Sequence, residues 1–157
     1  MSDGPSALPR VPSTAGRLAV PVPEIAAFVP GAAVTFLEWD GPLDATTDRE
    51  LDAFVGSRVA FDFTLAVPSA FPDGTAYVPP EPSLGFRQLA HHLHQQFRDR
   101  TPLAWGQGLV PHLPLPTEDG PRQGVLDRLP LTARAREVVL LDGSEVLGRW
   151  AFGTSAA

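Results

Sequence analysis

Proline and glycine end most of the apolar segments of this chain, so its strands and helices must be short. The clearest strand is residues 58–67, where every second residue is apolar and one face is predicted to be buried. That face consists of Val59, Phe61, Phe63, Leu65 and Val67. Asp142-Gly143, between the apolar segments 131–141 and 145–152, predicts a β-hairpin. Further strands are expected at residues 17–22, 33–39, 75–78 and 108–115.

Helix signals are fewer than strand signals. Thr47-Asp48-Arg49-Glu50 is a capping box that predicts the start of a helix, and Gly56 is a natural end for it. Ser83 is expected to cap a second helix, whose apolar stripe is Phe86, Leu89, Ala90, Leu93 and Phe97. Shorter helices are predicted within residues 23–29 and 117–129. Strands therefore outnumber helices, and the predicted class is α+β with antiparallel sheets.

The chain of 157 residues has the length of one domain. Residues 1–16 are rich in Pro, Ser and Gly without periodicity, which predicts a disordered tail. Residues 17–152 are expected to form the single domain, and residues 153–157 to fray.

Composition excludes several classes of function. The net charge is −6, and all 12 basic residues are arginines scattered along the chain, which argues against a long nucleic-acid partner. No apolar run is long enough to span a bilayer and no signal peptide is present, so no membrane partner and a cytoplasmic location are expected. The absence of cysteine excludes disulfides and thiolate metal sites. The lysine-free composition, rich in Arg, Ala, Pro and Gly, is typical of a GC-rich bacterial genome.

Two strands carry the residues that matter most for function. Val110-Pro111-His112-Leu113-Pro114 has a histidine followed two residues later by proline. Ala33-Val34-Thr35-Phe36-Leu37 has a threonine preceded two residues earlier by alanine. Residues two apart in a strand face the same way, so His112 and Pro114 share one face, as do Ala33, Thr35 and Leu37.

With these strands, the order of motifs resembles the two-histidine phosphoesterase superfamily, in particular bacterial proteins of the 2′-5′ RNA ligase and cyclic phosphodiesterase type. The resemblance covers about residues 17–152. Its other motifs are Leu18-Ala19-Val20-Pro21-Val22-Pro23-Glu24, Tyr77-Val78-Pro79-Pro80-Glu81-Pro82, residues 133–141 and Gly148-Arg149-Trp150. The resemblance implies a bilobal pair of antiparallel sheets with outer helices and a central cleft, to which each lobe contributes one His-x-Thr strand.

Neither His-x-Thr motif is complete. Ala33 stands in place of the first histidine and Pro114 in place of the second threonine, whereas Thr35 and His112 are retained. The family's two imidazoles share acid and base duties, and the loss of such a group costs about 10²–10⁴ in rate. The resemblance therefore implies that little phosphodiesterase activity remains.

The predicted site is an apolar cleft with a few polar groups. His112 and Thr35 are the predicted catalytic residues, and the predicted ligand-binding residues are Ala33, Leu37, Trp39, Phe61, Phe63, Tyr77 and Pro114. Such a lining suits a small, largely apolar metabolite, which the protein is expected to bind. Cyclisation, isomerisation and elimination are the candidate reactions, because holding a reactive conformer can itself lower the barrier. A residual phosphodiesterase and a non-catalytic interaction domain are the alternatives. No cofactor is expected, the oligomeric state is left open, and His91, His92 and His94 lack the i, i+4 spacing of a metal site.

Overall fold

Antiparallel strands and helices build a mixed α+β fold in the computed structural model, which describes residues 15–101 and 110–153. The strands are β1 (Ala15–Pro21), β2 (Ala33–Asp40), β3 (Phe61–Leu65), β4 (Ser69–Ala70), β5 (Ala76–Val78), β6 (Pro80–Glu81), β7 (Leu113–Pro114), β8 (Leu131–Ala135), β9 (Glu137–Asp142) and β10 (Glu145–Ala151). The helices are α1 (Ala45–Gly56), α2 (Leu84–Gln96) and α3 (Asp119–Asp127), with a 3-10 turn, η2 (Pro23–Ile25), after β1. The predicted tails lie almost entirely outside the described residues.

Two of the sheets are joined through a pair of residues. Strands β10-β9-β1-β2 form one sheet and β4-β5-β7 another. The two sheets meet where Thr35 of β2 pairs with His112, just before β7. Each residue donates its backbone N–H to the carbonyl of the other, with N···O distances of 2.8 and 2.9 Å. The two strands that sequence reasoning singled out therefore lie side by side.

The remaining sheet is β6-β3-β8. It is connected to the first sheet because β8 leads directly into β9. Residues 131–141 were predicted as one strand, and this prediction is wrong, because the chain changes sheets at Arg136. β8 pairs with β3, whereas β9 pairs with β1 and β10. The predicted hairpin at Asp142-Gly143 is confirmed, and Gly143 has the positive φ of 63° that this turn needs.

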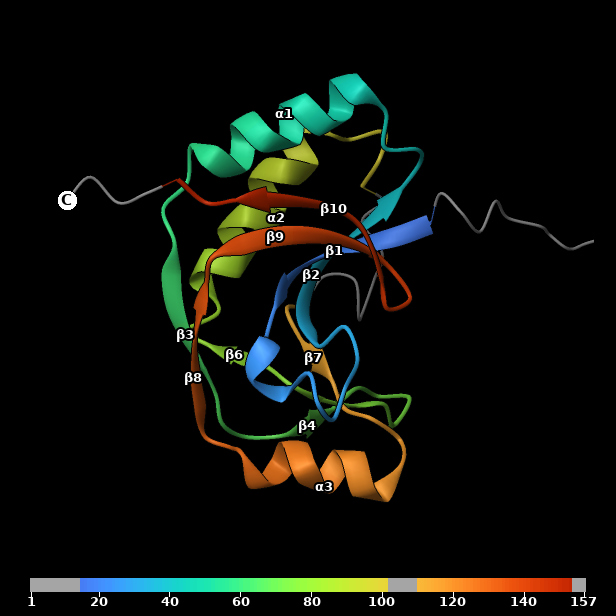
Figure 1. Ribbon diagram of the computed structural model, residues 1–157, viewed down its shortest axis with the longest axis vertical. Coiled ribbons are helices and arrows are strands. Elements are labelled where there is room, and N and C mark those ends of the chain that lie inside the picture. The colour runs from blue at the N-terminus through green and yellow to red at the C-terminus, as the bar shows by residue number, and fades with distance from the viewer. Residues whose placement is uncertain (1–14, 102–109, 154–157) are drawn as a thin grey trace, which may run out of the picture.

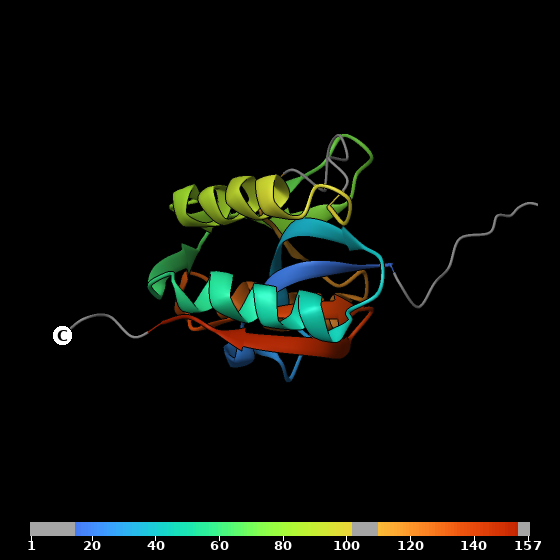
Figure 2. The same cartoon turned by 90° about the horizontal axis from the view of Figure 1, so that it is seen from above.

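The helices lie at the two ends of the molecule. α1 and α2 sit together at one end and α3 at the other, with the strands between them (Figure 1). α1 packs on β10 and α2 on β2 (Figure 2). The predicted capping box does not open α1. Instead Asp44 is the N-cap, and its carboxylate accepts from the backbone N–H of Thr47 at 2.8 Å.

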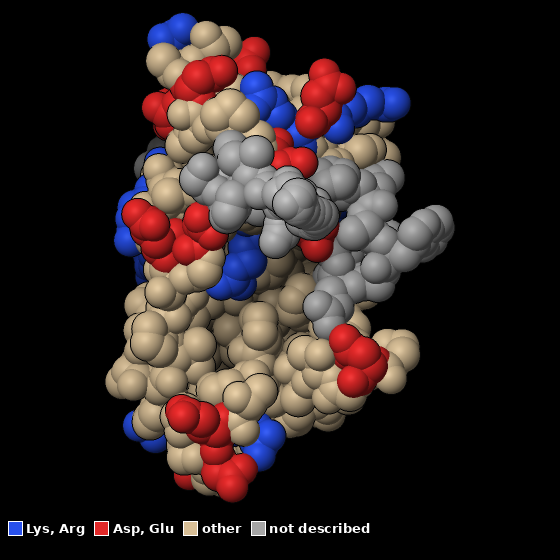
Figure 3. Space-filling view, turned by 90° about the vertical axis from the view of Figure 1, so that its right-hand side faces the viewer, with Lys and Arg blue, Asp and Glu red and all other residues tan. Residues whose placement is uncertain are grey.

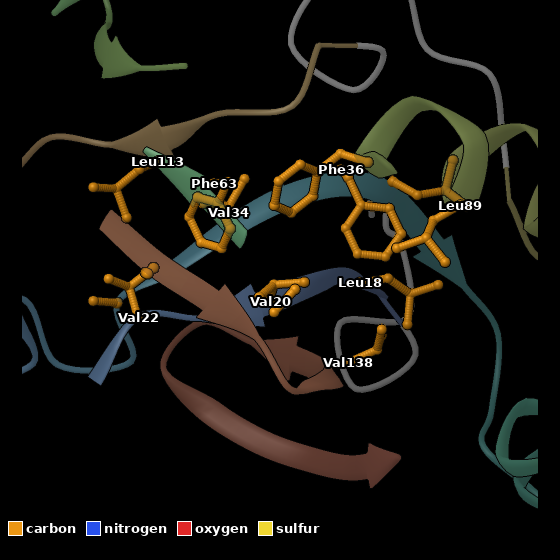
Figure 4. Packing of buried hydrophobic residues seen from close by; sticks show 14 of the residues in the cluster. Leu18, Val20, Val22, Val34, Phe36, Phe63, Leu89, Leu113 and Val138 are labelled. Atoms are coloured by element: carbon orange, nitrogen blue, oxygen red, sulfur yellow. The ribbon is translucent and has the colours of Figure 1, made fainter. Parts of the chain in front are cut away.

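A continuous apolar core fills the space between the sheets and the helices. β1 and β2 contribute alternate residues, among them Leu18, Val20, Val34 and Phe36 (Figure 4). Phe61 and Phe63 of β3 contact Phe86 of α2 edge-on, with ring centroids 5.2 and 5.1 Å apart. Each fully buried side chain of this size contributes about 1.5–3 kcal/mol.

A β-bulge changes the direction of side chains along β2. Leu18 pairs with Leu37 and Ala19 pairs with Thr35, so Phe36 is the extra residue on β2. Val34, before the bulge, and Phe36, in it, belong to the main core, whereas Ala33 joins a separate buried cluster on the opposite face. After the bulge, Leu37 and Trp39 also belong to the main core. The strict alternation predicted for residues 33–39 is therefore wrong beyond Thr35.

Two predicted strands are shorter than expected. In residues 58–67 the strand is Phe61–Leu65, and Val59 forms only an isolated bridge with Gly153. Val59 and Val67 are 56% and 63% exposed instead of buried. In residues 108–115 the first two positions lie outside the described residues, and the strand is Leu113–Pro114. Proline has no N–H to donate, so a segment with Pro111, Pro114 and Pro116 cannot form a long ladder.

Candidate functional site

One face of the joined sheets gathers five of the sequence-predicted residues: Ala33, Thr35, Tyr77, His112 and Pro114. Residues paired directly across antiparallel strands point to the same face. Thr35 is paired with His112, and Tyr77 with Pro114. On the other side of Thr35, the same face carries a small buried cluster formed by Ala19, Ala33, Val139 and Leu141. We call this surface the site face.

His112 is a titratable side chain on the site face. The residue is 8% exposed, and its Nδ1 lies 2.6 Å from the carbonyl oxygen of Val110. Because a carbonyl can only accept, Nδ1 carries the proton and Nε2 of the neutral ring is a proton acceptor. Burial lowers the pKa of His112, the hydrogen bond to Val110 opposes this, and the charge of Arg17 lowers it further. The ring is therefore neutral at physiological pH.

Arg17 brings a positive charge to the same face. Its Nη1 donates to Thr35 Oγ1 at 2.7 Å, and its Nη2 donates to the carbonyl oxygen of Gly143 at 3.0 Å. Burial lowers the pKa of Arg17, although a guanidinium stays protonated at any physiological pH. Among the described residues no carboxylate pairs with this guanidinium. Arg17 is thus a partly buried cation without a counterion in the described chain.

Two aromatic rings enclose His112 on one side. Phe71 and Tyr77 are stacked, with centroids 4.1 Å apart and planes 24° apart. The imidazole meets Phe71 edge-on at 5.2 Å and Tyr77 at 6.0 Å. These rings limit the rotation of the imidazole and supply an apolar wall beside it.

Four predicted ligand-binding residues lie away from the site face. Leu37 and Trp39 are each 1% exposed in the main core, where Trp39 packs edge-on against Phe97 at 5.5 Å. Phe63 is also 1% exposed in that core. Phe61 lines a different surface pocket of about 200 Å³ together with Arg58, Gln88 and Phe152. The bulge explains why Leu37 and Trp39 lie in the core, since it exchanges the two faces of β2 beyond Phe36.

Sequence reasoning missed Arg17 and Phe71. Phe71 is held by a turn in which Gly74 has φ 92°, Gly74 N–H donates to Phe71, and Phe71 N–H donates to Thr75. Pro72-Asp73-Gly74 is a recognisable turn signal that would have predicted the β4–β5 hairpin. Arg17 had no comparable signal, because its position depends on the register between β1 and β2.

Other predicted features can be placed briefly. His94 contacts Thr101 and His92 contacts Arg58, and the described residues contain no group of three or more His, Asp or Glu arranged to hold a metal ion. Arg134 pairs with Asp62 at 2.9 Å on the surface. Within residues 15–101 and 110–153, no helix is long and apolar enough to cross a membrane.

The side of the molecule that carries the β9–β10 turn and the β4–β5 loop is hollowed. Figure 3 shows a floor of uncharged residues there, with arginine on its upper margin. A concave, mostly uncharged surface with a few polar groups is the usual form of a small-molecule site.

Comparisons with known proteins give no independent identification. No protein-family model and no curated protein matches the chain.

Proposed function

We propose that the site face binds a small, largely apolar metabolite and that His112 acts on it as a proton acceptor. The reaction would be one that needs few ionisable groups, such as a cyclisation, an isomerisation or an elimination. Holding a reactive conformer beside a single base can itself lower such a barrier.

The observation that carries this proposal is the setting of the imidazole. Its Nδ1 is anchored on Val110, which leaves Nε2 as the basic nitrogen, and no described residue bonds to Nε2. Burial and the charge of Arg17 keep the ring neutral, so Nε2 can accept a proton. Phe71 and Tyr77 flank the ring, and the cluster of Ala19, Ala33, Val139 and Leu141 lies on the same face; both favour an apolar substrate.

We further propose that the fold is a bilobal arrangement like that of the two-histidine phosphoesterases, with altered motif strands. The pairing of Thr35 with His112 supports this, because it places the two retained motif residues side by side. Ala33 and Pro114 offer no proton-transfer group and no hydroxyl, which argues for chemistry other than phosphoryl transfer.

The proposal is tested by binding of small neutral probes, followed by two-dimensional NMR. Indole, cyclohexanol and 2-phenylethanol would be titrated into the protein, and we expect them to shift the ring signals of His112 and Tyr77. His112→Gln should weaken this binding, whereas His91→Gln, on an exposed position of α2, should not. Binding that leaves the His112 signals unchanged, or no binding at all, would overturn the proposal.

A residual phosphodiesterase is the second candidate, and the guanidinium of Arg17 beside Thr35 favours it, since it could hold a phosphate oxygen. Hydrolysis of 2′,3′-cyclic nucleotides measures this activity directly. We expect little turnover by the unmodified chain and a gain in Ala33→His/Pro114→Thr. Robust turnover that His112→Ala abolishes would make phosphodiester hydrolysis the function.

A further inference from the structure

We propose that the ligand of the site face carries a carboxylate, and that Arg17 is the residue that binds it. This inference rests on the proposed function and names the chemical class of its ligand. The ligand would thus be a small apolar acid, with its body against Phe71 and Tyr77 and its charged end on the guanidinium.

The first argument is the missing counterion. A partly buried charge is costly unless it is paired. The two bonds of Arg17 go to neutral oxygens, the Thr35 hydroxyl and the Gly143 carbonyl, and its other N–H groups have no acceptor among the described residues. Glu38 lies opposite Arg17 in the β1–β2 register, yet the two side chains form no ion pair. A bound anion would supply the charge that the described chain does not.

The second argument is the number and position of donors. Arg17 and Thr35 lie together, whereas Ala33 and Pro114 add no donor to the face. His112 is neutral and presents an acceptor at Nε2, so it repels rather than binds an anionic oxygen. A planar guanidinium matches the two coplanar oxygens of a carboxylate. A tetrahedral phosphodiester needs donors around more of its surface, and this face does not provide them.

The test uses matched probes that differ in one group: 3-phenylpropanoate, 3-phenylpropanamide and methyl phenethyl phosphate. Dissociation constants would be measured by NMR titration at constant ionic strength, with the His112 ring signals as the reporter. We expect the acid to bind about tenfold more tightly than the amide, as a charge-assisted hydrogen bond would give. The phosphodiester should bind more weakly than the acid.

Three variants show whether Arg17 causes the preference. Arg17→Met should bring the acid down to the affinity of the amide, and Arg17→Lys should keep only part of the preference. Arg134→Met removes the same charge from an exposed ion pair on β8 and should keep the full preference. Thermal melts without ligand would establish that each variant is folded.

The outcomes separate this inference from the function on which it rests. If acid and amide bind equally and both shift His112, the site binds apolar ligands and the carboxylate inference is wrong. If the preference survives in Arg17→Met, Arg17 is not the anion-binding residue and the inference is wrong as well. Tighter binding of the phosphodiester overturns it in favour of phosphate chemistry. If no probe shifts the His112 signals, the proposed function itself fails.

Discussion

The two halves of β2 differ in their surroundings although they belong to one continuous strand. Before the bulge, Ala33 and Thr35 point to the site face, and Thr35 contacts Arg17. After the bulge, Leu37 and Trp39 are packed in the main core, although they are odd-numbered like Ala33 and Thr35. A single extra residue exchanges the two faces of a strand. The odd-numbered residues of β2 therefore lie on the site face before the bulge and in the main core after it.

The largest expected effect is the loss of stability in Trp39→Ala, which tests the core half of this comparison. A fully buried tryptophan is expected to cost about 3–5 kcal/mol of unfolding free energy when truncated, measured by urea denaturation. Trp39→Phe should cost much less, because it keeps most of the packing and removes an indole N–H that has no hydrogen-bond partner among the described residues. A loss from Trp39→Ala as small as that of a surface change would place Trp39 outside the core.

A smaller loss of stability is expected from Thr35→Val, in the first half of β2. Valine keeps the shape and removes the hydroxyl that accepts from Arg17, so the expected loss is roughly 1 kcal/mol in the same denaturation experiment. Thr64→Val is the matched control, since the Thr64 hydroxyl contacts Thr132 on an exposed part of β3 and should contribute less. Equal losses in the two variants would mean that the Thr35–Arg17 bond adds nothing particular.

The smallest effect concerns pH. Burial, and then the charge of Arg17, lowers the pKa of His112 below the usual 6.5, so the unfolded chain takes up a proton before the folded one. The contribution of His112 to the free energy of unfolding is fully present above about pH 6.5 and decreases as the pH falls below that value. His112→Gln should remove this part of the acid sensitivity, whereas His91→Gln should keep it. NMR titration should show a higher pKa of His112 in Arg17→Met.

Local patterns predicted the elements better than their boundaries or partners. The Asp142-Gly143 hairpin and the α+β class followed from turn chemistry and periodicity, which act over a few residues. The start of α1 was misplaced because Asp44 and Thr47 are both good caps, and in the structure Asp44 caps the helix by accepting from the backbone N–H of Thr47. The break of 131–141 at Arg136 could not be predicted, because it depends on which strands β8 and β9 meet.

The residues that share the site face were predicted only in part, for the same reason. Thr35 and His112 were singled out from two separate segments, and the structure pairs them directly. Leu37 and Trp39 were assigned to the site by alternation, which holds only until a bulge interrupts the register. Arg17 was missed because nothing in its local sequence shows that its guanidinium reaches a threonine 18 residues away.

The hydrogen bond from Arg17 to Gly143 gives an exposed turn a part in the site. Gly143 lies 126 residues away from Arg17 in the chain, and a side chain added at its α-carbon would meet open space. Its positive φ of 63° nevertheless disfavours other residues, so replacement would reshape the turn and move the carbonyl. A substitution at Gly143, in an exposed turn, could thus change the orientation of the Arg17 guanidinium while every residue of the site face stays the same.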